Sequence, residues 1–323
     1  MFAPVPVLPW PDALAGTPAT VVLEHALARG RLAHSLLITG DDFEVLRGAA
    51  LALADRLLNP PDTAVERRRA IEGHPDCFHL RPAGKSRQIG ADATREIIGK
   101  VQVSALAGSH KVALLHECDR MNTTASNIFL KTLEEPPAHT TLLLLTTRPH
   151  ALLPTIRSRC QLFRFVTPRL PARVDGWPAW LEDYRAWLAL LHGGAAKTAP
   201  ADAMFRLYGL VARFGVLLET ATDSLWATQK VTLPEELTEE EAQAIETGLG
   251  KGLRDRLLAD LERATGEYAR EVLVTPAAAS GARAFVETVR HLEHTAGLLR
   301  VNFNDTSALE LFMLQALRAW TRR

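Results

Sequence analysis

The sequence lacks any excess of charge. Its 37 basic and 37 acidic residues leave a formal net charge of zero over 323 residues. A neutral chain has no general attraction for nucleic acid or anionic lipid. We therefore expect any contact with DNA to come from a local patch or through partner proteins.

Long apolar runs are also absent. No apolar stretch approaches the ~20 residues that span a bilayer. The first residues, MFAPVPVLPWPD, lack the charged and apolar regions of a signal peptide. We expect a cytoplasmic protein with no membrane partner.

Cysteine is scarce. Cys77, Cys118 and Cys160 are odd in number and far apart, which argues against a disulfide framework and favours reduced, mostly buried thiols. His74 and His79 flank Cys77, but their spacing does not match the paired ligands of a structural zinc site. We predict no bound metal.

Short apolar runs alternate with helical patterns over the first 165 residues. Runs such as 34–40, 112–115 and 141–147 are too short for helices and are typical of buried parallel strands. Helical patterns such as 44–58 and 123–135 lie between them. Five such strands joined by helical crossovers predict a parallel α/β domain with helices on both faces.

The composition changes after residue 167, where a proline-rich hinge leads to helical patterns alone. An aromatic helix is expected first, with one apolar face made of Trp180, Tyr184, Trp187 and Leu191. A second stripe comprises Met204, Leu207, Tyr208, Val211 and Phe214. The last helix is expected to begin at Asn304 or Asp305, and its stripe comprises Leu309, Phe312, Met313, Ala316, Leu317 and Trp320.

The turn after the run 34–40 stands where a phosphate-binding loop would. Such a loop needs glycines that let the backbone wrap the phosphates, then a lysine and a hydroxyl residue. Aligned from Gly40, these last positions carry Val45, Leu46 and Arg47. The sequence therefore predicts no ATP binding at this turn.

The same turn carries the carboxylates of Asp41, Asp42 and Glu44. They would repel a triphosphate at close range, whereas they suit the positive end of a helix. The turn is either a plain strand-turn-helix with an acidic first turn or the relic of an ATP site.

The most distinctive stretch is KVALLHECDRMNTTASNIFLKTLEEPP, followed by TLLLLTT. It resembles the clamp-loader branch of the AAA+ ATPases, and IGADATREI and VNFNDTSALELFMLQALRAW resemble its delta-prime subunits. The resemblance implies a RecA-like AAA+ domain over residues 1–166, a short helical lid over 167–200 and a helical collar over 201–323.

In that family the first strand end of this stretch carries a Walker B acidic pair. Here the quartet reads His116, Glu117, Cys118 and Asp119, so a histidine stands where an aspartate helps to hold magnesium. A neutral imidazole is a poor ligand for this hard ion. The departure implies a degenerate nucleotide site with no cofactor, and the resemblance places an idle sensor among the threonines at the end of 141–147.

The motif Ser158, Arg159, Cys160 follows in the order that clamp loaders use. The resemblance implies that Arg159 is an arginine finger for the ATP of a neighbouring subunit. A guanidinium is always charged and forked, so it can stabilise charge on transferred phosphoryl oxygens. The alternative is an arginine that pairs with a surface carboxylate.

The resemblance as a whole implies a non-catalytic subunit of the bacterial DNA polymerase III clamp loader. Its partners would be the ATPase motor subunit and the delta subunit and, through the assembly, the sliding clamp and primed DNA. Two alternatives remain: an active AAA+ motor subunit, and a stand-alone DNA-binding or adaptor protein. The basic loop Arg81–Arg87 either touches DNA or is simply solvated.

Overall fold

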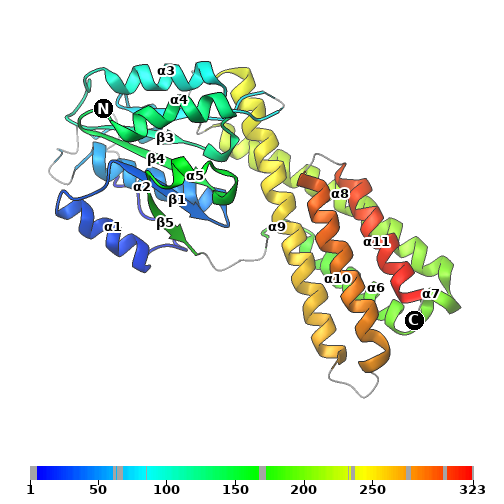
Figure 1. Ribbon diagram of the computed structural model, residues 1–323. Helices are drawn as coiled ribbons and strands as arrows, with labels where there is room; N and C mark the ends of the chain where they lie inside the picture. The colour runs from blue at the N-terminus through cyan, green and yellow to red at the C-terminus, as the bar shows by residue number, and fades with distance from the viewer. Residues whose placement is uncertain are drawn as a thin grey trace. The chain divides into compact units, whose positions relative to one another are not determined.

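The computed structural model describes residues 6–60, 63, 68–84, 86–166, 172–231, 233, 237–273, 278–300 and 304–321. The chain forms two compact units. The first comprises residues 1–169 and 232–247, and the second comprises residues 170–231 and 248–323. The first unit contains the sheet, whereas the described part of the second unit is helical (Figure 1).

The sheet has five parallel strands in the order β2-β3-β4-β1-β5. The strands are β1 (Ser35–Gly40), β2 (Cys77–Leu80), β3 (Lys111–Leu115), β4 (Thr140–Thr146) and β5 (Gln161–Phe165). This topology confirms the predicted parallel α/β domain, and the predicted strand 34–40 differs from β1 by one residue. All carboxyl ends of parallel strands lie at one edge, which is where open α/β sheets bind ligands.

Helices cover both faces of the sheet (Figure 1). They are α1 (Pro18–Ala28), α2 (Phe43–Leu58), α3 (Ala91–Gln102), α4 (Thr123–Glu134) and α5 (Pro154–Arg157), with short 3₁₀ turns η2 (Ile71–Gly73), η3 (Cys118–Arg120) and η4 (Pro149–Ala151). Leu36 and Ile38 pack with α1 and α2, whereas Leu37 packs with α3 and α4. Because strand neighbours point to opposite faces and both faces are covered, β1 reads as an unbroken apolar run.

Helix α1 ends at a glycine and buries only part of its apolar side. Gly30, at φ +60°, donates its N–H to the Leu27 carbonyl, and the Arg31 N–H reaches the Ala26 carbonyl. This is a Schellman-type helix end, which requires a left-handed residue. Leu23 is buried, whereas Val22 is 52% exposed.

The second unit contains α6 (Trp177–His192), α7 (Ala195–Thr198), α8 (Pro200–Lys230), α10 (Ala278–Arg300), α11 (Asp305–Thr321) and most of α9 (Glu239–Leu273). The predicted aromatic face of α6 is confirmed, because all four of its residues are buried in one core shared with α8 and α11. Trp180 and Trp187 donate their indole N–H groups to the carbonyls of Leu210 and Ala203, at 2.9 and 3.0 Å. Such bonds let large aromatic side chains be fully buried.

The stripes predicted on α8 and α11 are largely confirmed. On α8, Leu207 and Phe214 are buried, but Tyr208 is 47% exposed and does not belong to the core. Asn304 caps α11 by accepting the Ser307 N–H at 2.9 Å. No helix among the described residues is both long and apolar enough to cross a membrane. The division into a lid over 167–200 and a collar over 201–323 stays a prediction.

Candidate functional site at the carboxyl ends of the strands

The N-terminus of α2 already holds an anionic group from the chain itself. The Asp42 carboxylate accepts the backbone N–H groups of Glu44 at 3.0 Å and Val45 at 3.4 Å. Free amides at a helix N-terminus are the groups that bind phosphate in nucleotide-binding folds. Asp42 therefore occupies donors that a nucleotide phosphate would need.

The apolar side chain of Leu46 occupies the position that a phosphate-binding lysine would take. Leu46 is 1% exposed and packs in the core between the sheet and α2, and Val45 packs against the same core. Gly40 is required for this packing, since a Cβ there would lie 2.7 Å from the Phe165 carbonyl oxygen and 2.9 Å from Leu46 Cδ2. Side chains therefore fill this turn, which does not form an open phosphate-binding loop.

Arg47, at the predicted hydroxyl position, is neutralised by two carboxylates. Its Nε lies 3.1 Å from Glu44 Oε2, and its Nη1 lies 3.0 Å from Glu72 Oε1. The guanidinium is only about one-quarter exposed, at 24%. The one cation of this turn thus links α2 to η2.

His116 follows β3 directly and is buried against a second histidine. Its Nε2 lies 3.1 Å from His79 Nδ1, with the rings stacked at 5.4 Å between centroids, and Phe43 contacts it edge-on. Burial lowers the pKa of His79 to about 3 and the pKa of His116 well below its usual value, with Arg81 acting in the same direction. Both rings are therefore neutral at ordinary pH, and one must donate to the other.

Glu117 is held in the left-handed region, at φ 46°, and forms an ion pair with Arg87. Arg120 lies 3.5 Å from its second carboxylate oxygen. Both arginines therefore pair with the Glu117 carboxylate, which is the one acidic group left of the Walker B pair. The described residues at this strand end thus do not fit a magnesium-nucleotide complex, since the Glu117 carboxylate is already paired and a histidine stands in place of the aspartate.

The basic loop Arg81–Arg87 contains a buried arginine, which fits neither contact with DNA nor simple solvation. Arg87 is 5% exposed and lies in its ion pair with Glu117, so it is not presented to DNA. Arg81 is half-buried. Lys85 lies outside the described residues.

A polar link that the sequence did not reveal joins the ends of β3 and β4. Thr146 donates its hydroxyl to Asp119 at 2.6 Å, and the Arg148 guanidinium lies 2.7 Å from the same carboxylate. Thr146 also accepts the Arg148 N–H at 2.9 Å. Because β3 and β4 are neighbours in the sheet, their carboxyl ends bring these residues together. The same adjacency of strand ends, between β2 and β3, accounts for the pairing of His79 with His116.

The Ser158-Arg159-Cys160 motif follows α5 and is anchored at both ends. Cys160 packs against the core under α4, and burial raises the pKa of its thiol to about 12. Ser158 donates its hydroxyl to the Thr155 carbonyl at 3.1 Å. Between them, the Arg159 side chain stays 35% exposed.

Arg159 is paired with the last glutamate of α4. Its Nε and Nη2 lie 2.8 and 2.6 Å from Glu134 Oε1, and its Nη1 donates to the Thr155 carbonyl at 3.0 Å. The structure thus joins Arg159 to the LKTLEEPP stretch through Glu134. Its described contacts do not involve the Gly40–Arg47 turn.

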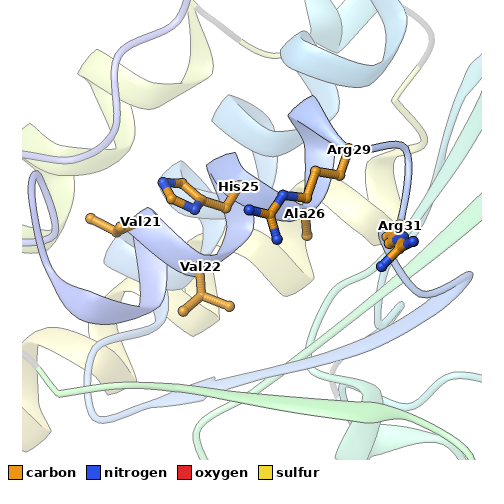
Figure 2. Close-up of a pocket in the computed structure, with 6 residues that line it drawn as sticks. All are labelled: Val21, Val22, His25, Ala26, Arg29 and Arg31. Atoms are coloured by element: carbon orange, nitrogen blue, oxygen red, sulfur yellow. The ribbon is translucent and has the colours of Figure 1, made fainter.

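A shallow hollow of about 270 Å³ lies on α1 and away from these groups (Figure 2). Its lining is aliphatic and basic: Val21, Val22, His25, Ala26, Arg29 and Arg31. None of these residues belongs to the Gly40–Arg47 turn or to the strand ends.

Most of the first unit is similar in sequence to known proteins. Residues 17–169 match the family model described as DNA polymerase III, delta subunit. The DNA polymerase III subunit delta' of Pseudomonas aeruginosa is 39% identical over 130 residues, which cover 39% of this chain and 40% of that protein. The Escherichia coli subunit delta' is 41% identical over 138 residues, which cover 41% and 40%.

The Bacillus subtilis DNA polymerase III subunit tau is 33% identical over 155 residues, which cover 45% of this chain and 27% of that protein. The matched region spans about two fifths of the length of the delta' relatives, at 40% of each.

The five-stranded parallel sheet forms an α/β domain, and its sequence is similar to that of clamp-loader subunits of DNA polymerase III. Over residues 17–169 the chain is similar to the delta-prime subunits of DNA polymerase III. The resemblance carried by the LKTLEEPP and SRC motifs is thereby confirmed.

Proposed function

We propose that the chain is an ATPase-inactive subunit of the bacterial replicative clamp loader. It holds neighbouring subunits in the ring and lends Arg159 to the ATP site of a neighbour during loading of the sliding clamp on primed DNA. Its direct partners are the ATPase motor subunit and the delta subunit, and it works in the cytoplasm. It is a non-catalytic part of the polymerase III holoenzyme.

The observation that carries the proposal is the occupied N-terminus of α2. ATP bound there would have to displace the Asp42 carboxylate from two amides and place its phosphates beside Asp41 and Glu44. Repulsion between like charges a few ångströms apart is strong in a partly buried turn. Leu46 supplies no compensating cation, so we expect the isolated chain not to bind ATP.

The setting of Arg159 supports a role in trans. Exposed ion pairs contribute only ~0–1 kcal/mol, so the guanidinium can exchange Glu134 for a more highly charged triphosphate at small cost. The anchors at Ser158 and Cys160 hold the backbone, so rotation of the Arg159 side chain is enough to release it from Glu134. A preorganised guanidinium is well suited to stabilise phosphoryl transfer.

An active motor subunit is the nearest alternative, because the tau relative shares the same fold region. Leu46 and His116 oppose it at the two positions that ATP and magnesium would need. Saturable binding of ATP by the isolated chain, measured by calorimetry, would support the motor-subunit alternative. The adaptor alternative predicts that the chain fails to form a stoichiometric complex with the motor and delta subunits in gel filtration.

The test is DNA-stimulated ATP hydrolysis by the reconstituted loader. Loss of one charge-stabilising donor costs on the order of a hundredfold in turnover at the affected site. We expect this loss for Arg159→Ala while the complex still assembles. The matched control is Arg157→Ala, which removes the same charge from an exposed position two residues away and should leave turnover near wild type. Unchanged hydrolysis with Arg159→Ala would rule out the finger and leave a scaffold.

A further inference from the structure

The guanidinium of Arg159 is fully engaged within its own unit. Glu134 Oε1 accepts from Nε and Nη2, at 2.8 and 2.6 Å, and the Thr155 carbonyl accepts from Nη1 at 3.0 Å. All three nitrogens therefore have an acceptor. An arginine binds phosphate through these same N–H groups. Arg159 thus has to give up at least part of this arrangement before it can contact a nucleotide.

The stability of α4 does not explain the carboxylate of Glu134. Glu134 is the last residue of the helix, and Glu135 is its C-cap. The C-terminus of a helix carries a partial negative charge, so a carboxylate there is unfavourable and a cation is preferred. The side chain of Glu134 is also 49% exposed, so it is not a core residue. The contact that does favour a carboxylate at this position is the ion pair with Arg159.

The core of the first unit fixes the two partners relative to each other. Glu134 and Arg159 are 25 positions apart in the sequence. Phe129 and Leu133 of α4 are buried in the same core as Ile156 of α5. Because this core holds both backbones, the carboxylate lies at a defined place beside the arginine. A counter-ion on a rigid element can hold a side chain in one position.

We propose that Glu134 is a positioning residue that holds Arg159 in a resting state and competes with the phosphates of the neighbouring subunit's ATP for the guanidinium. The inference rests on the proposed function, because a finger that acts in trans is what has such a competitor. Pairing with Glu134 lowers the fraction of chains with a free guanidinium, and the apparent affinity for ATP falls by the same factor. For an exposed ion pair this factor is about two to five.

The first measurement is the reactivity of Arg159 toward phenylglyoxal, an arginine-specific reagent, in the intact isolated chain. Glu134→Gln removes the charge but keeps the side-chain length and a similar helix propensity, so the fold should be preserved. We expect Arg159 to react about two- to fivefold faster in this variant, as followed by mass spectrometry. The exposed Arg157 is the internal reference and should react equally in both proteins. Equal reactivity of Arg159 would overturn the inference.

The second measurement is DNA-stimulated ATP hydrolysis by the reconstituted loader over a range of ATP concentrations. With Glu134→Gln we expect the half-maximal ATP concentration to fall about two- to fivefold, while the maximal rate stays near wild type. The matched control is Glu135→Gln, which removes the adjacent exposed charge and should leave both values unchanged. In an Arg159→Ala background, Glu134→Gln should have no effect, because the pair is already lost. A merely structural role of Glu134 would persist in that background.

The outcomes separate this inference from the proposed function. A lower maximal rate with Glu134→Gln, or an effect that persists in the Arg159→Ala background, would overturn the resting-state role and leave the finger in place. An unchanged half-maximal ATP concentration would do the same. Unchanged hydrolysis with Arg159→Ala alone would overturn the finger and, with it, the competition for the guanidinium.

Discussion

The buried pair His79 and His116 makes the stability of the first unit depend on pH. The folded protein holds His79 at a pKa of about 3, against 6.5 for the free side chain. Below pH 6.5, His79 binds a proton in the unfolded chain but stays neutral in the folded chain. The contribution of neutral His79 to the free energy of unfolding is therefore present above pH 6.5 and is lost as the pH falls toward 3. At pH 5 the difference of 1.5 units corresponds to about 2 kcal/mol from His79 alone.

The perturbation that isolates this effect is the double replacement His79→Leu with His116→Leu. Replacing both hydrogen-bonding partners by apolar groups avoids leaving a buried orphan. The pKa of His116 is lowered in the same direction by burial, so the wild type should lose at least ~2 kcal/mol more than the variant between pH 7 and pH 5. His74 and His110 also have lowered pKa values, but they are present in both proteins and cancel in the comparison.

The assay is hydrogen exchange by mass spectrometry on the intact chain, with opening free energies taken from peptides that cover β2 and β3. This local readout avoids assuming that both units unfold together. The control is His150→Gln on η4, an exposed position, which should retain the wild-type pH dependence. Equal pH dependence in wild type and the double variant would refute the account of a neutral buried pair.

Two further predictions concern the closed turn. Asp42→Ala removes the cap of α2 and should lower the free energy of unfolding, measured by urea titration, by about 1 kcal/mol. The variant should still not bind ATP, because Leu46 fills the site. Binding of nucleotide by this variant would contradict the conclusion that side chains fill the turn. Leu46→Ala should cost about 2–5 kcal/mol because it opens a cavity in a fully buried site, whereas Leu106→Ala, at an 80% exposed position, should change the same titration by less than ~0.5 kcal/mol. Comparable losses for both leucines would show that Leu46 is not a core residue.

Much of the fold was predictable because its signals are local. Short apolar runs and the 3.6-residue period located the parallel strands and most helices, and the caps at Asn304 and Gly30 follow from the side chain or backbone freedom of one residue. The error at Tyr208 falls where a helix has more than one apolar side. Tyr208 fits a helical period, but periodicity does not say which side of the helix meets the core.

The composition of the candidate site was predictable, but its pairings were not. Leu46 in place of a lysine and His116 in place of an aspartate are visible in the sequence. That His79 stacks on His116, and that Arg87 lies buried against Glu117, depends on which strands are neighbours. Residues separated by 37 and 30 positions meet in these two pairs.

The sequence by itself determined the class of fold, the family motifs and the absence of the usual phosphate-binding residues, because each depends on residue type and short-range spacing. Only the tertiary structure decided that Asp42 occupies the helix amides, that Arg159 stays at the surface beside Glu134, and that Tyr208 of α8 stays exposed. Burial and pairing arise from the order of strands and the packing of helices, which bring together groups that no local pattern connects.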